Sequence, residues 1–131
     1  MITILVDHNV EGQAMLLLGV LGTAGWLELR PLRLIMFAQA GLAYHSSDRE
    51  VWRFAQDKGW LLLTANRRMQ GEDSLEQTIR EESTPASLPV MTISDGRRMV
   101  EKMYRERCAV RLLEIVLDLD NYRGVGRVFL P

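Results

Sequence analysis

Short apolar runs alternate along the chain with longer stretches in which apolar side chains recur every three or four residues. The short runs carry almost no charge and are rich in aliphatic and β-branched residues, so each predicts a buried strand. Four runs of this kind lie at residues 2–6, 60–64, 90–93 and 127–130. Residues 26–30 alternate apolar and polar side chains, which predicts a half-buried strand closed by Pro31. The run 32–42 fits either a strand or a helical turn.

The longer stretches predict helices. Residues 11–21 form a broad apolar face that ends at Gly22. Ser47 followed three residues later by Glu50 is a capping-box pattern, so a helix is expected to begin there and to stop near Gly59. Two more helices are predicted, at residues 74–82 and 97–119. The apolar face of the second consists of Val100, Met103, Tyr104, Cys108, Leu112, Ile115, Val116 and Leu119.

The alternation of strands and helices predicts an α/β fold with a mostly parallel sheet. A chain of 131 residues suits a single domain covering residues 1–131. Hydrophobic residues make up 47% and charged residues 25%, and the net charge is −1, so no global charge attracts nucleic acid. The single Cys108 excludes an internal disulfide and a cysteine-based zinc site within one chain.

The sequence also indicates where the protein acts. The uncharged stretch from Gly12 to Leu27 contains four glycines and is short for a bilayer span, so no membrane partner is expected. Asp7 interrupts the first apolar run, which argues against a signal peptide. A cytoplasmic protein is therefore expected.

Polar residues follow three of the predicted strands. Asp7, Asn66 and Asp95 each stand just after an apolar run. If the strands are parallel neighbours, these groups converge at one edge of the sheet, where ligands bind in such folds. Carboxylate oxygens there suit a divalent cation. Local turns and helix caps also explain Asp and Asn at strand ends; from spacing alone this interpretation is slightly favoured for Asp7, and an N-cap role is favoured for Asp95.

Other polar residues have a structural and a functional interpretation. Asp48 and Glu50 fit a capped helix start, although Asp48 is also a candidate metal ligand. His8 and His45 lie near candidate carboxylates. Two arginine pairs are candidate phosphate ligands, with ion pairs to Glu72, Asp73 or Glu101 as the alternative: Arg67, Arg68, Arg97 and Arg98. The second pair falls in the first turn of the predicted long helix, where the helix dipole disfavours cations.

The order and spacing of these motifs resemble the PIN-like superfamily, in particular its short, stand-alone bacterial members. The resemblance is carried by Leu5-Val6-Asp7-His8-Asn9, by Ser46-Ser47-Asp48-Arg49-Glu50 with the residues to Ala55, and by Leu61-Leu62-Leu63-Thr64-Ala65-Asn66-Arg67. It covers most of the first half of the chain and continues loosely from Leu88 to Asp95. It implies a three-layer α/β/α sandwich with a mostly parallel central sheet.

The resemblance also implies an activity. Active PIN domains are Mg²⁺- or Mn²⁺-dependent ribonucleases, many of them toxins of toxin–antitoxin pairs. Carried over, the catalytic positions are Asp7, Asp48 and Asn66, and Asp7 and Asp48 are the expected metal ligands. Asp95 is a further candidate metal ligand, in place of a missing acid. Asn66 and Arg68 stand where the related proteins have acids, and His8 stands where they usually have Glu. Asn9 and Glu50 match the remaining motif positions.

Three functional hypotheses follow. The first is a metal-dependent ribonuclease with a partly degenerate acidic site. The second is an inactive PIN-like domain that binds RNA, a phosphate ligand or a protein through the two arginine pairs. The third is a toxin-like partner in a protein complex that is active only in that assembly, with a cognate antitoxin or another protein as the expected partner. A homodimer through Leu32 to Phe37 is a further expectation, and the same residues could equally form core.

Overall fold

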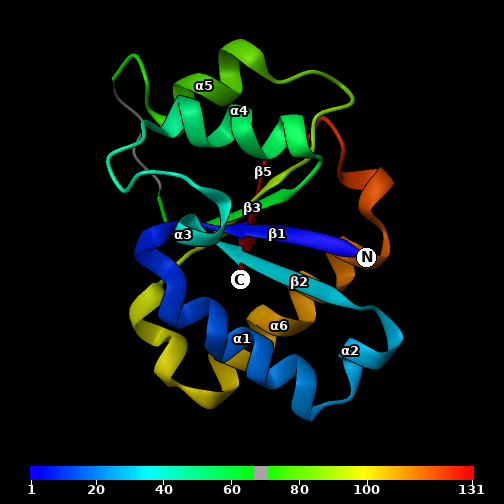
Figure 1. The fold of residues 1–131 in the computed structure, drawn as a ribbon. Helices are drawn as coiled ribbons and strands as arrows, with labels where there is room; N and C mark the ends of the chain where they lie inside the picture. Colours follow the sequence, from blue (N-terminus) through cyan, green and yellow to red (C-terminus); the bar gives the residue numbers. More distant parts are fainter. Residues whose placement is uncertain (67–70) are drawn as a thin grey trace.

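The structure, a computed structural model, describes residues 1–66 and 71–131 and contains a central parallel sheet (Figure 1). Within these ranges the strand order is β2-β1-β3-β4-β5, and every neighbouring pair is parallel. The strands are β1 (Ile2–Val6), β2 (Leu32–Met36), β3 (Leu61–Thr64), β4 (Val90–Ile93) and β5 (Arg127–Leu130). The α-helices are α1 (Glu11–Thr23), α2 (Trp26–Leu29), α3 (Phe37–Ala40), α4 (Asp48–Lys58), α5 (Leu75–Glu82) and α6 (Lys102–Leu117). Three 3₁₀ segments are also assigned there: η1 (His8–Val10), η2 (Gly96–Val100) and η3 (Leu119–Tyr122).

Helices cover both faces of the sheet (Figure 1). Because side chains alternate along a strand, Ile4 and Val6 of β1 pack with α1 and α6, whereas Leu5 packs with α4 on the opposite face. The same division holds in β3, where Leu61 and Leu63 face α1 and α6 and Leu62 faces α4. The predicted three-layer α/β/α fold class is therefore confirmed.

The capping box predicted for α4 is present. The Glu50 backbone amide donates to Ser47 Oγ at 3.1 Å, and the Ser47 amide donates to Glu50 Oε1 at 3.3 Å. The helix ends at Gly59, whose φ of 70° lies in the left-handed region that glycine adopts most readily. These local signals place Asp48 at the first residue of α4, above the carboxyl ends of the strands.

The prediction of a strand at residues 26–30 is wrong, because this segment forms α2. Gly25, with a φ of 77°, starts the helical turn, and Pro31 ends it and leads into β2. Five residues of alternating polarity are too few to distinguish a strand from one helical turn. The run 32–42 contains both of its predicted alternatives in succession, β2 and then α3. Its side chains pack against both core layers.

The prediction of one continuous helix at 97–119 is also wrong. The segment divides into η2, α6 and η3, because Glu101 adopts an extended conformation between the first two. Val100 and Met103 are 77% exposed and do not belong to the apolar face predicted for them. Cys108 is fully buried, as expected from the spacing. No helix in the described ranges is long and apolar enough to cross a bilayer.

Candidate functional site

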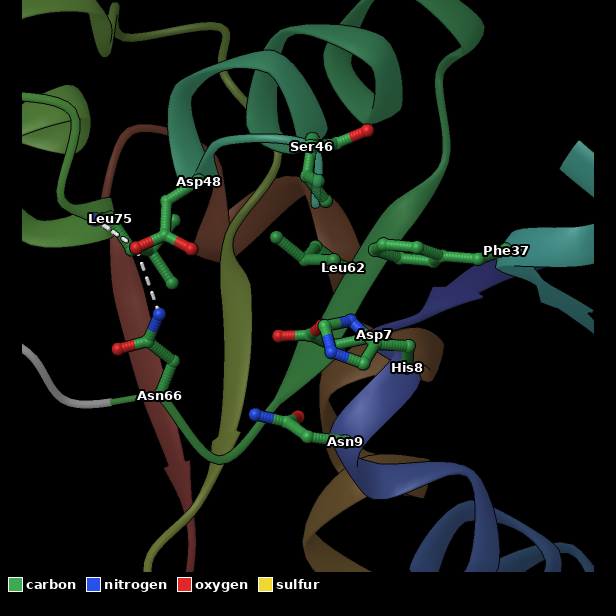
Figure 2. A pocket seen from close by; sticks show the side chains of 10 residues that line it. Asp7, His8, Asn9, Phe37, Ser46, Asp48, Leu62, Asn66 and Leu75 are labelled. Atoms are coloured by element: carbon green, nitrogen blue, oxygen red, sulfur yellow. Dashed lines mark hydrogen bonds and ion pairs between the residues drawn. The ribbon is translucent and has the colours of Figure 1, made fainter. Parts of the chain in front are cut away.

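A small pocket lies where the strand order reverses. The chain passes from β1 to β2 on one side and then returns to β3 on the other side of β1. Ligands of open α/β sheets bind outside the carboxyl ends of the strands at such a switch point. The pocket there has a volume of about 70 Å³ (Figure 2). It is lined by Asp7, His8, Asn9, Phe37, Ser46, Asp48, Val51, Leu62, Asn66 and Leu75.

Asp7 directly follows β1 and is held against β3. Its backbone amide donates to the Leu63 carbonyl at 2.9 Å, and its Oδ2 accepts a hydrogen bond from the Thr64 hydroxyl at 2.8 Å. The His8 Nδ1 lies 3.3 Å from Asp7 Oδ1, and the Asp7 side chain is 14% exposed. Burial raises the pKa of Asp7, and the Asp48 charge adds to this rise against the opposing effects of Thr64 and His8.

Asp48 lies across the pocket from Asp7 and connects three elements. Its Oδ2 accepts hydrogen bonds from the Leu75 backbone amide at 3.1 Å and from Asn66 Nδ2 at 2.9 Å (Figure 2). As an acidic residue in the first turn of α4, Asp48 also has the favourable position predicted relative to the helix dipole. Ser47 caps α4, so the Asp48 carboxylate is directed to the start of α5 and to the segment after β3.

Asn66 is fixed by its backbone as well as by its side chain. Its amide nitrogen donates to Thr64 Oγ1 at 3.0 Å, and its carbonyl accepts from Arg127 Nη1 at 2.6 Å. The Thr64 hydroxyl therefore donates to Asp7 while it accepts from Asn66. The sequence prediction missed both Thr64 and Arg127. Their positions in the sequence give little indication of a role, because Thr64 is the last residue of a leucine-rich strand and Arg127 is the first residue of a short strand.

His8 and Asn9 also line the pocket, but two other candidates do not. The His8 ring lies beside Phe37 and Tyr44, with centroid distances of 5.3 Å and 5.4 Å. Glu50 is engaged in the capping box, as the structural interpretation predicted. His45 is not among the lining residues.

Of the two arginine pairs, Arg97 and Arg98 are not among the residues that line the pocket. Arg67 and Arg68 lie outside the described residues. Arg97 and Arg98 belong to η2, so the prediction that they lie in the first turn of the long helix is wrong. Arg98 pairs with Glu101 at 3.3 Å, the predicted alternative, and lies over the Tyr104 ring.

The other acids considered from the sequence are used elsewhere. The Asp95 carboxylate accepts from the Arg97 backbone amide at 3.1 Å and caps η2 rather than the long helix. Asp73 pairs with Arg49 at 3.0 Å, and the Glu72 carbonyl accepts from the same guanidinium. Neither Asp95, Glu72 nor Asp73 is among the residues that line the pocket.

Two carboxylates, those of Asp7 and Asp48, are among the residues that line the pocket. Among the residues that the structure describes, no group of three or more His, Cys, Asp or Glu side chains could hold a metal ion. Mg²⁺, however, is usually held by one or two carboxylates, with water and substrate phosphate completing its coordination. Asp7 and Asp48 supply such a carboxylate pair, and the neutral amide of Asn66 lies beside them.

Comparisons of the chain with protein-family models, curated proteins and solved structures found no match.

Proposed function

We propose that the protein is a PIN-like, Mg²⁺- or Mn²⁺-dependent endoribonuclease. The observation that carries the proposal is the convergence of Asp7 and Asp48, from two separate elements, on one pocket at the switch point of the sheet. The two carboxylates are close enough for the Asp48 charge to contribute to the raised pKa of Asp7. A divalent cation would relieve this repulsion, so the pair has the electrostatics of a cation site.

Asp7 and Asp48 would hold the cation, and Asn66 would orient Asp48 through its hydrogen bond. When bound, the cation would supply an activated water and charge stabilisation for phosphodiester cleavage. Thr64 fixes one oxygen of Asp7 by donating to Oδ2. Both carboxylates are thus oriented by hydrogen bonds from residues of, or just after, β3.

A second candidate is a PIN-like domain that binds RNA without a metal. The observation in its favour is that the Asn66 amide already donates to Asp48, which partly satisfies this carboxylate without a cation. An acid at position 66 would instead repel Asp48. Asn66 therefore weakens the negative field of the pocket, and it is the residue that best separates the two candidates.

The resemblance also suggests the setting of this activity. We include in the proposal RNA as the substrate and the cytoplasm as the compartment, which the single, buried Cys108 supports. A cognate antitoxin or another protein subunit, and a second copy of the chain, are the further partners that the resemblance suggests. Co-expression with candidate partners, followed by co-purification, tests them.

Calorimetric titration of Mn²⁺ into the protein tests the cation site. We expect micromolar binding, about −8 kcal/mol, and its loss in Asp7→Asn. Asp57→Asn is the matched control, because Asp57 is an exposed acid on α4 outside the pocket lining, and it should bind as the wild type does. Asn66→Asp should strengthen binding by adding a negative charge beside Asp48.

Cleavage of a single-stranded oligoribonucleotide should follow the same order among the variants. Absence of Mn²⁺ binding up to millimolar concentration in the wild type and in Asn66→Asp would refute the cation site. Metal-independent, salt-sensitive RNA binding by the same preparations would then establish the second candidate.

A further inference from the structure

We propose that His8 and Tyr44 form a stacking subsite for an unpaired nucleobase at the mouth of the pocket. The inference rests on the proposed function, because it names the substrate of that site as single-stranded RNA. Tyr44 was not a candidate from the sequence. It is 66% exposed, although its ring contacts a residue of the pocket lining.

Three rings lead from the core to the solvent beside Asp7. Phe37 is 1% exposed and lines the pocket, and the His8 ring packs on it at a 58° interplanar angle (Figure 2). Tyr44 packs next to His8 at 47°. The buried ring therefore supports His8, which supports Tyr44, and much of the Tyr44 ring remains available to a ligand.

The segment that carries Tyr44 is hydrogen-bonded on both sides of this residue. The Leu42 amide donates to the Phe37 carbonyl at 3.0 Å, and the Ser46 amide donates to the Ala43 carbonyl at 3.0 Å. Ser46 itself lines the pocket. The backbone that carries Tyr44 is thus ordered before any ligand binds, and His8 packs against the Tyr44 ring, which lowers the entropic cost of stacking.

The size of the pocket requires a base to lie outside it. Its volume of about 70 Å³ is small beside the roughly 300–1,000 Å³ of typical ligand pockets. The pocket is therefore too small to hold a nucleoside. A nucleotide whose phosphate binds through a cation held by Asp7 and Asp48 must place its base outside the pocket, and the exposed Tyr44 ring packs there against His8 of the lining.

Stacking on an exposed ring favours single-stranded RNA over a duplex. The faces of paired bases are covered by their neighbours, whereas unpaired bases are free to stack on aromatic side chains. The net charge of −1 provides no general attraction to phosphates, so specific contacts must contribute a large part of the affinity. Stacking on Tyr44 is a contact of that kind, and it tolerates any base.

Fluorescence anisotropy with a labelled ten-nucleotide single-stranded RNA in EDTA tests the subsite without depending on metal. Tyr44→Ala should weaken binding by roughly 5- to 150-fold, the range for one base stacked on an aromatic ring. Tyr44→Trp should retain it. Phe129→Ala, at an exposed ring on β5, is the matched control and should leave the Kd unchanged. An oligonucleotide whose bases are all replaced by abasic sites should bind wild type and Tyr44→Ala equally.

Equal Kd values for wild type and Tyr44→Ala with intact RNA would overturn the subsite, as would undetectable RNA binding by the wild type both in EDTA and in the presence of Mn²⁺. Mn²⁺-dependent cleavage by a protein with equal Kd values would leave the proposed function intact and refute only the subsite. A loss of affinity in Tyr44→Ala without Mn²⁺ binding or cleavage in the wild type would support the subsite and refute the nuclease.

Discussion

Arg127→Met would test how the candidate site is held in place. The Arg127 side chain is 9% exposed and contacts three other segments of the chain. Its Nη1 donates to the Asn66 carbonyl at 2.6 Å and to Thr92 Oγ1 at 2.7 Å, and its Nη2 pairs with Glu76 at 3.1 Å. Methionine retains an unbranched apolar stem but removes all of these contacts.

The expected loss of stability follows from these contacts. Each of the two uncharged acceptors loses a hydrogen bond worth about 1 kcal/mol. Glu76 is 24% exposed, so its ion pair lies between surface pairs, worth under about 1 kcal/mol, and buried pairs, which cost about 3–5 kcal/mol to break. With the ion pair taken at about 1 kcal/mol, near the value of a surface pair, the total is about 3 kcal/mol. With about 2.1 cal/mol/K of unfolding entropy per residue over 131 residues, the melting temperature should fall by about 11 °C.

Thermal and urea unfolding at pH 7, followed by circular dichroism, would measure this loss. Arg123→Met is the matched control, because Arg123 is a more exposed arginine paired with Asp120, and its replacement should cost less than about 1 kcal/mol. Combining Arg127→Met with Glu76→Gln should show a coupling of about 1 kcal/mol. The role of the Arg127 contacts in stability would be refuted if Arg127→Met lost no more stability than the control. Strict additivity of Arg127→Met and Glu76→Gln would likewise refute it.

Three more predictions concern stability and reactivity. Because burial and the Asp48 charge raise the pKa of Asp7 above 3.8, its ionised form destabilises the fold. Asp7→Asn should therefore be more stable than wild type at pH 7, by a margin that shrinks as the pH falls through the raised pKa; an unchanged margin in urea unfolding would contradict this. Gly124→Ala should lower the free energy of unfolding by about 2 kcal/mol or more, because φ is 78° and the new Cβ would lie 3.0 Å from Pro85. Gly19→Ala, in an open helical position, should raise it by about 0.5–1 kcal/mol. Equal melting temperatures of the two variants would contradict this. Burial raises the pKa of Cys108 to about 11, so iodoacetamide at pH 8 should modify the unfolded protein rapidly and the folded protein hardly at all, as mass spectrometry would show.

The sequence predicted the fold class because its strongest signals are local. Uncharged aliphatic runs form β1, β3 and β4, and the capping box at Ser47 begins α4 as expected. The predictions for residues 26–30 and 97–119 are wrong because the periodicity of a short or interrupted segment does not determine its secondary structure. Polar groups at the strand ends were predictable in position, since parallel neighbours end at the same edge.

The partners of those polar groups were not predictable. Asp7 bonds to Thr64, 57 residues away, and Asn66 bonds to Arg127, 61 residues away. Such pairs depend on strand order and register, which no local pattern encodes. The separation of Asp95 from the pocket has the same origin, because its carboxylate turns back to the amide of Arg97 instead of toward Asp48.

The contact between Arg127 and the Asn66 carbonyl has a consequence for biosynthesis. Asp7, Asp48 and Asn66 all leave the ribosome well before Arg127, which lies 61 residues beyond Asn66. A nascent chain that has exposed all three pocket residues still lacks the guanidinium that fixes the segment after β3. The contact that holds the Asn66 backbone therefore forms only when β5 joins the sheet, late in synthesis of the chain.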